Sequence, residues 1–138
     1  MAYDLEIAAI TIYCEASDQP DIAKLGVAWS MVNRLLVPGK PYGWTIAEIC
    51  LRRMQYSEWN ADRQDNANLI RAARCQSSDP LILDCRAMIE GALANTSSDP
   101  TRGATHYYDG SIAAPYWTEP PATKTAQLGK LLFYKGVP

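Results

Sequence analysis

The 138-residue sequence lacks the features that mark several large classes of protein. It contains no run of about 18 apolar residues, so no transmembrane helix is predicted. Lys and Arg number 13 against 15 Asp and Glu, which gives a net charge of −2 and not the basic composition of a nucleic-acid-binding protein. The motifs G-x-x-x-x-G-K, G-x-G-x-x-G and G-x-S-x-G are missing, so nucleotide-binding and serine-hydrolase functions have no support.

Histidine and cysteine are also scarce. The single histidine, His106, argues against a catalytic zinc site, because such sites usually use two or more histidines. The four cysteines lack zinc-ligand spacing, and we expect them to be reduced and half-buried; one disulfide is the alternative in an oxidising compartment. No metal and no cofactor are predicted. Asp4 and Glu6 interrupt the first apolar stretch, so no signal peptide is predicted.

Apolar residues recur at helical spacing through the first two thirds of the chain. This pattern predicts helices over residues 4–16, 20–36, 45 to about 54–60, 62–75 and 79 to about 92. Asp4 is expected to cap the first helix, and Thr45 with Glu48 has the spacing of a capping box. Gly26 lies inside the second helix, where glycine costs about 1 kcal/mol relative to alanine, so we expect another backbone to approach it closely.

The pattern changes after Asn95. Residues 96–104 form a turn-rich connection, residues 104–110 read as a strand, and residues 123–136 read as a hairpin with Gly129 at its turn. The predicted fold class is α+β in a single domain, 1–138. It has a mainly helical lobe of about 1–95 and a small antiparallel β lobe of about 96–138, and a cleft is expected at the seam between them.

Glu15 has a position that suits acid catalysis. In the helix predicted over 4–16 it lies at the shoulder of the buried stripe, so its carboxyl group is partly desolvated. Desolvation raises the pKa of a carboxyl group, and a protonated carboxyl near neutral pH acts as a general acid in cleavage of glycosidic bonds. The alternative interpretation is a solvated glutamate in the last turn of an amphipathic helix.

Aromatic side chains gather in three short non-helical stretches, with amide and hydroxyl side chains between them. Such groups suit a sugar, which has C–H faces and hydroxyl edges, although tyrosines on short strands also pack small sheets. The aromatic residues are Tyr56, Trp59, Tyr107, Tyr108, Tyr116 and Trp117. A nucleophilic pair of Cys14 and His106 is a weaker hypothesis, because a cysteine late in a helix and beside a glutamate lacks the electropositive surroundings it needs.

Four stretches, in order, resemble the family of cell wall hydrolases that includes the spore-cortex-lytic enzyme SleB and its relative CwlJ. They are "IYCEASDQP", "GVAWSMVNR", "QYSEW", and "DPTRGATHYYDG" followed by Trp117 and "TAQLGKLLFYKG". The resemblance covers roughly residues 5 to 135. It implies a lysozyme-like, two-lobed fold and an enzyme that cleaves peptidoglycan.

The resemblance also implies roles for particular residues. Glu15 is the catalytic acid of a lytic transglycosylase, which cuts between N-acetylmuramic acid and N-acetylglucosamine and leaves an anhydro-muramic end. The residues expected to bind the glycan strand are Gln55, Tyr56, Ser57, Thr105, His106, Tyr107 and Trp117, with Asn33 in support. Three residues depart from the family pattern: Ser17 replaces an arginine, Asp18 a common glycine, and Leu131 stands near a frequent histidine. The Ser17 change removes a cation that could act on Glu15.

Other functions stay open at this stage. A hydrolysing muramidase would use a second carboxylate, for which the candidates are Asp18, Asp21, Glu58, Asp109 and Glu119. An inactive glycan-binding module, and an amidase or Cys–His peptidase, are further alternatives. The expected setting is that of a phage endolysin, a monomer that waits in the host cytoplasm and acts on the wall in the periplasm. Its predicted partners are glycan strands, with neither nucleic acid nor membrane among them.

Overall fold

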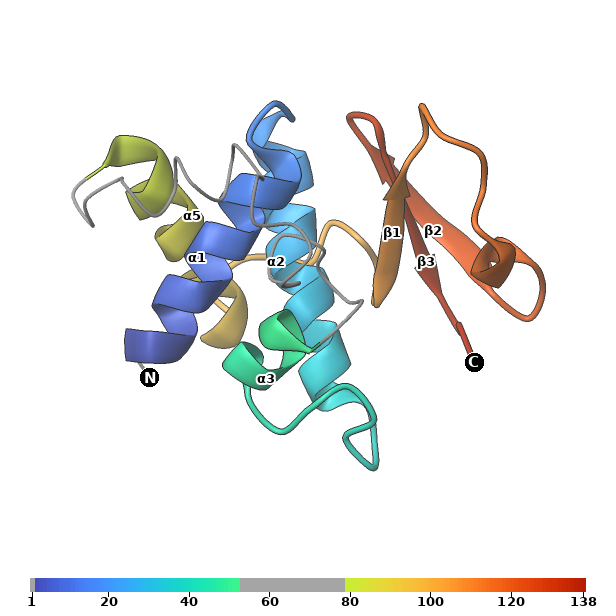
Figure 1. Ribbon diagram of the computed structural model, residues 1–138, viewed down its shortest axis with the longest axis horizontal. Coiled ribbons are helices and arrows are strands. Elements are labelled where there is room, and N and C mark those ends of the chain that lie inside the picture. Colours follow the sequence, from blue (N-terminus) through green and yellow to red (C-terminus); the bar gives the residue numbers. More distant parts are fainter. Residues whose placement is uncertain (1, 53–78) are drawn as a thin grey trace.

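The structure, a computed structural model, describes residues 2–52 and 79–138. Its elements are α1 (Ala2–Ala16), α2 (Asp21–Leu36), α3 (Ile46–Leu51), α5 (Pro80–Leu93), β1 (His106–Asp109), the 3-10 helix η3 (Tyr116–Thr118), β2 (Thr123–Leu128) and β3 (Leu131–Lys135). The helices lie on one side and the sheet on the other, with α2 between α1 and the sheet (Figure 1). The predicted α+β fold is confirmed. The helix predicted over 62–75 falls outside the described residues.

One predicted N-cap forms as expected, and the other expected capping residue bonds to a different helix. Thr45 caps α3 by accepting a hydrogen bond from the Glu48 N–H at 3.1 Å, as predicted, while the Glu48 carboxylate accepts from the Trp44 N–H at 2.6 Å. Asp4 was expected to cap its own helix, but its carboxylate accepts from the Ala47 N–H at 2.9 Å, because α1 already begins at Ala2. Asp4 therefore ties α1 to the first turn of α3.

One predicted helix end is wrong by several residues, and one predicted helix start by a single residue. α3 ends at Leu51 and not near 54–60, because Arg52 leaves the helical conformation and donates its backbone N–H to the Glu48 carbonyl. α2 begins at Asp21, and Pro20 precedes it in extended conformation as the N-cap. In the part of the chain that the structure describes, no helix is long and apolar enough to cross a membrane.

α2 is the central element of the core. It is buried nearly all round, because one face packs on the other helices and the opposite face on the sheet. Gly26 lies on the sheet side, where a Cβ atom would come within 2.8 Å of Phe133 and 2.9 Å of Leu128. The expected close approach therefore exists, but the atoms that approach Gly26 belong to side chains and not to a backbone.

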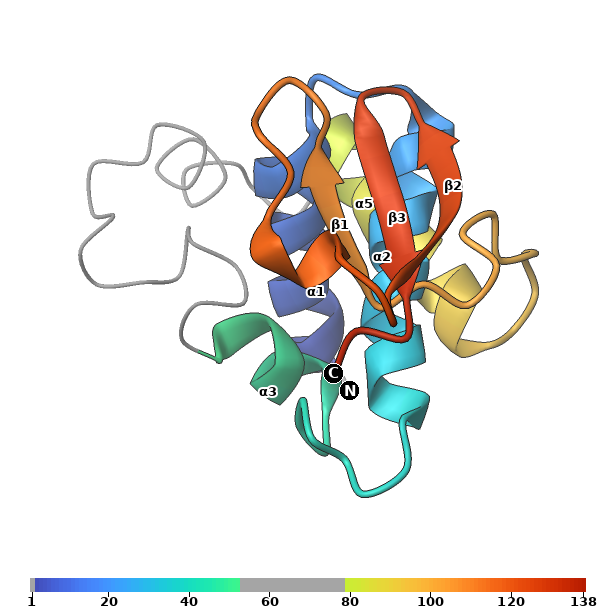
Figure 2. The ribbon, with the colours of Figure 1, turned by 90° about the vertical axis from the view of Figure 1, so that its right-hand side faces the viewer.

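The sheet is antiparallel, with β3 between β1 and β2 (Figure 2). Tyr107 pairs with Phe133 across β1 and β3, and Leu128 pairs with Leu131 across the hairpin. Gly129 is at the hairpin turn, as predicted, with a φ of +58° that few other residues adopt readily. The strands predicted over 104–110 and 123–136 are thus confirmed with tighter limits.

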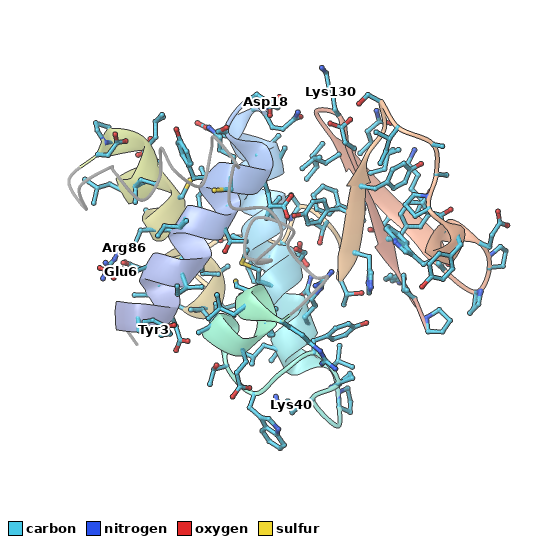
Figure 3. All side chains as sticks on the ribbon, viewed as in Figure 1. Tyr3, Glu6, Asp18, Lys40, Arg86 and Lys130 are labelled. Carbon is cyan, nitrogen blue, oxygen red and sulfur yellow. The ribbon has the colours of Figure 1, made fainter. Side chains whose placement is uncertain are left out.

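Two sets of hydrogen bonds hold the lobes together away from the core. The Gln19 side-chain oxygen, in the loop after α1, accepts from the Lys130 N–H at 2.9 Å. Figure 3 shows neighbouring Asp18 and Lys130 at the same end of the molecule. In the connection before β1, the Asp99 carboxylate accepts from Asn33 Nδ2 at 2.9 Å and from Thr101 Oγ1 at 2.6 Å. The hairpin turn is therefore fixed to the loop after α1, and the loop entering β1 is fixed to α2.

Candidate active site

A cavity of about 200 Å³ lies at the seam between the lobes, where the sequence predicted a cleft. α1 contributes Glu15 from its last turn, α2 contributes Arg34, and β1 contributes Tyr107, Tyr108 and Asp109. Ile112 and Leu131 supply the apolar part of the lining. Glu15 is half-buried, which agrees with the expected position at the shoulder of the helix stripe. The cavity thus places the partly desolvated carboxyl group of Glu15 beside the polar side chains of β1.

Arg34 brings a positive charge to this cavity. It is only 5% exposed, and its Nε donates to the Thr105 carbonyl at 2.5 Å. Its guanidinium carbon lies 5.2 Å from the centre of the Tyr42 ring, within the range of a cation–π interaction. The replacement of arginine by Ser17 therefore does not leave the cavity without a cation, because α2 supplies one.

Asp109 is a second carboxyl group in the same cavity. Its Oδ1 accepts from the Ser111 N–H at 2.9 Å and from the Ser111 hydroxyl at 2.7 Å. These hydrogen bonds lower the pKa of Asp109 below its usual value, so it is ionised at neutral pH. Of the second carboxylates proposed from the sequence, Asp109 lines the cavity with Glu15, whereas Glu119 lines a different one and Glu58 is outside the described residues.

A second hollow, of about 240 Å³, lies beside η3. Its lining residues are His106, Tyr116, Trp117, Glu119, Pro120, Pro121, Val137 and Pro138. Neighbouring residues of β1 line different hollows: Tyr107 lines the first cavity and packs on Phe133, whereas His106 lines the second hollow and contacts Trp117. Tyr108 also contacts Trp117, although it lines the first cavity. Trp117 also contacts Tyr134 edge-on, with ring centres 5.5 Å apart. These rings therefore form a connected cluster as well as a wall of the hollow.

His106 is held as a neutral imidazole. Burial, and secondly the charge of Arg34, lower its pKa from 6.5 to about 4. Its Nδ1 lies 2.8 Å from the Thr105 hydroxyl, and its ring packs between Tyr42 and Trp117. At the pH of a cytoplasm or periplasm it contributes polar ring atoms and no charge.

The predicted site residues divide into five groups. Glu15 and Tyr107 meet in the first cavity, and His106 and Trp117 line the second hollow. Thr105 touches Arg34 and His106, and so lies between the hollows. The Asn33 amide contacts Asp99 and the Ala104 carbonyl, so its contacts in the described chain support the loop before β1. Gln55, Tyr56 and Ser57 lie outside the described residues, and substrate binding by all of these residues stays a prediction.

Three lining residues were missed as site residues: Arg34, Tyr108 and Ile112. A signal for Arg34 was present, because it continues the helical spacing of the buried positions Ala23, Val27 and Ser30. A charged residue on a buried stripe indicates a paired or functional group. Leu131, noted as a departure from the family pattern, also lies in this cavity, so that departure falls within the site itself.

Of the three cysteines in the described ranges, Cys14 is half-buried, as predicted, and the other two are less accessible than expected. Cys50 and Cys85 are buried, and not half-buried as predicted. Burial raises the pKa of the Cys85 thiol to about 11, which keeps it protonated and unreactive. Cys75 is outside the described residues.

The family of this chain follows from its similarity to known proteins. A family model described as cell wall hydrolase matches residues 18–134. The chain belongs to the cell wall hydrolase family. Membership supports a peptidoglycan-degrading enzyme, as the sequence motifs implied. The matched region begins just after Glu15, so it does not itself include the proposed acid.

Two solved structures share the fold of this cell wall hydrolase. The catalytic domain of Bacillus cereus SleB is 18% identical, with a TM-score of 0.74 over 98% of this chain and 91% of that one. The catalytic domain of the germination-specific lytic transglycosylase SleB from Bacillus anthracis is 19% identical, with a TM-score of 0.70 over 96% of this chain and 93% of that one. No curated protein sequence matches the chain. The lysozyme-like fold is therefore established by structure.

Proposed function

We propose that this cell wall hydrolase is a lytic transglycosylase that cleaves the bond between N-acetylmuramic acid and N-acetylglucosamine, with Glu15 as its acid and base. The observation that carries the proposal is the cavity at the lobe seam, into which α1 brings the half-buried Glu15 carboxyl group beside polar groups of β1. The likeness of the fold to a SleB described as a lytic transglycosylase supports it.

The reaction needs one carboxyl group in two protonation states. Glu15 donates its proton to the glycosidic oxygen, and the bond between that oxygen and C1 of the muramic acid breaks. The resulting carboxylate then takes the proton of the C6 hydroxyl group, whose oxygen attacks C1. The proton returns to Glu15, no water is consumed, and the product ends in an anhydro-muramic acid.

The test of the acid is Glu15→Gln, which has nearly the same shape but no carboxyl proton. General acid–base catalysis contributes about 10²–10⁴ in rate, so lysis of permeabilised cells should fall at least about a hundredfold with folding intact. Glu90→Gln is the matched control, because Glu90 is exposed on α5 and pairs with Arg86 at 3.1 Å, away from the cavity. Near-normal activity of the Glu15 variant would remove this residue from the mechanism.

A hydrolysing muramidase is the second candidate, and Asp109 is the observation that favours it. Two carboxyl groups in one cavity, of which Asp109 is ionised, are the arrangement of retaining and inverting glycosidases. Mass spectrometry of digested peptidoglycan distinguishes the two reactions. Anhydro-muramic ends identify the transglycosylase, and reducing muramic ends identify the hydrolase.

We further propose that the enzyme acts as a phage endolysin, which is held in the host cytoplasm until the membrane is breached. Intact cells that contain it should then keep their shape, and should lyse when chloroform opens the inner membrane. Lysis without any permeabilising agent would contradict this role.

A further inference from the structure

Arg34 is a buried cation that lines the first cavity and is linked through Thr105 and Tyr42 to His106, which lines the second hollow. Its Nε holds the Thr105 carbonyl at 2.5 Å, and the Thr105 hydroxyl lies 2.8 Å from His106 Nδ1. Its guanidinium lies over Tyr42, whose ring also contacts His106. Because arginine stays protonated at every pH at which proteins are folded, these contacts hold a permanent positive charge behind the first residues of β1.

The charges that face Glu15 come from two elements. α2 supplies Arg34, β1 supplies the Asp109 carboxylate beside the uncharged Tyr107 and Tyr108, and β3 contributes only the apolar Leu131. Among the residues that the structure describes in this lining, Arg34 is the cation. A nearby positive charge favours a carboxylate over its acid, and a negative charge does the reverse. Arg34 is buried whereas Asp109 is half-buried, so Arg34 acts through a lower dielectric and its effect on Glu15 should be the larger.

We propose that Arg34 is a positioning residue that stabilises the carboxylate form of Glu15 between the two proton transfers, and thereby sets the upper pH limit of cleavage. The inference rests on the proposed role of Glu15 as acid and base. When the glycosidic bond has broken, Glu15 carries a negative charge in a cavity that already contains the Asp109 carboxylate. The Arg34 guanidinium offsets that repulsion without taking or giving a proton.

His106 reports the charge of Arg34 independently of catalysis. The pKa of His106 is lowered first by burial and second by the positive charge of Arg34. The groups that face or surround the imidazole are Arg34, Tyr42, Thr105, Trp117 and Glu119. Since the chain has one histidine, its ring protons can be followed by NMR without overlap.

The experiment compares Arg34→Gln, which removes the charge but keeps a donor for the Thr105 carbonyl, with Arg34→Lys, which keeps the charge. In Arg34→Gln the alkaline limb of the pH–rate profile should move up by about 1 unit, the maximal rate should fall about tenfold, and the His106 pKa should rise by about 1 unit. Arg34→Lys should move the limb and the His106 pKa by less than about a third as much. Arg34→Met is the second neutral variant if the glutamine variant does not fold.

Arg86→Gln is the matched control, since it removes the same charge from a half-buried site outside the cavity lining. Arg86 pairs with Glu6 and Glu90 on the side of the helices away from the sheet (Figure 3), so both measured values should stay at the wild-type level. An unmoved alkaline limb in Arg34→Gln, or equal shifts in the lysine and glutamine variants, would overturn the inference. Those outcomes leave the proposed function standing, which instead depends on Glu15→Gln and on the products.

Discussion

Gly26 sets how closely α2 approaches the sheet, and replacing it with alanine tests whether that contact controls stability. An alanine Cβ would lie 2.8 Å from Phe133 Cζ, 2.9 Å from Leu128 Cδ1 and 3.2 Å from Thr101 Cγ2. Phe133 and Thr101 are fully buried, so neither side chain has space to move away. The added methyl group must therefore push the sheet from the helix or force strained side-chain conformations.

The expected loss follows from two opposing terms. Overpacking in a filled core costs about 1–3 kcal/mol, while replacing a helical glycine with alanine gains up to about 1 kcal/mol. The free energy of unfolding should therefore fall by about 1 kcal/mol, which lowers the midpoint of thermal unfolding by about 4 °C in a chain of this size. Circular dichroism during heating measures this change, and urea titration at 25 °C provides the second value.

Gly91→Ala is the matched control within the same molecule. Gly91 also lies in a helix, α5, but a Cβ there would meet its nearest atom, Thr96 Oγ1, at an ordinary 3.5 Å. This variant should be stabilised by about 0.5 kcal/mol, because only the gain in helix propensity acts. If Gly26→Ala raised the midpoint as Gly91→Ala does, the contact between α2 and β3 would not be tight, and the account of the lobe seam would be wrong.

Two further predictions concern the stability of the protein at low pH. His106 has a pKa of about 4 in the folded protein and 6.5 in the unfolded chain, so on acidification the unfolded chain takes up a proton at higher pH than the folded protein does. The free energy of unfolding should therefore be steady above pH 6.5 and should decrease as the pH falls from about 6.5 to 4. The loss is at most about 3 kcal/mol, reduced by solvent screening, and His106→Phe should abolish this slope in urea titrations. Burial alone would raise the pKa of Asp99, but hydrogen bonds from Thr101, Asn33 and Gly103 lower it below 3.8. Its contribution is therefore present above pH 3.8 and lost below, and Asp99→Asn should cost about 1–3 kcal/mol at pH 7 by the same titrations.

The helices and the hairpin were predictable because their signals are local. Thr45, Asp79 and Gly129 each act on residues next to them in the chain, and the structure places each where the pattern did. The position of Glu15 at the edge of a buried stripe also followed from periodicity alone. Such signals need no knowledge of how distant segments pack.

The contacts between segments were not predictable in the same way. Asp4 was assigned to its own helix because the pattern could not show that α3 would lie beside it, with the Ala47 N–H in reach. The separation of Tyr107 and His106 into different hollows follows from strand alternation, but which face meets Glu15 depends on the docking of the sheet on α2. The helical spacing of Arg34 indicated a buried charge, but its place beside Glu15 depends on the same docking.

The hairpin turn has one more consequence for the enzyme. A side chain at Gly129 would come within 2.6 Å of the Gln19 oxygen, and the next residue, Lys130, donates its backbone N–H to that same oxygen. Gln19 is four residues after Glu15, so this hydrogen bond ties the loop that follows α1 to the hairpin turn between β2 and β3. The spacing between the end of α1 and the hairpin is therefore set by a hydrogen bond that lies outside the lining of the cavity, so it belongs to the fold itself.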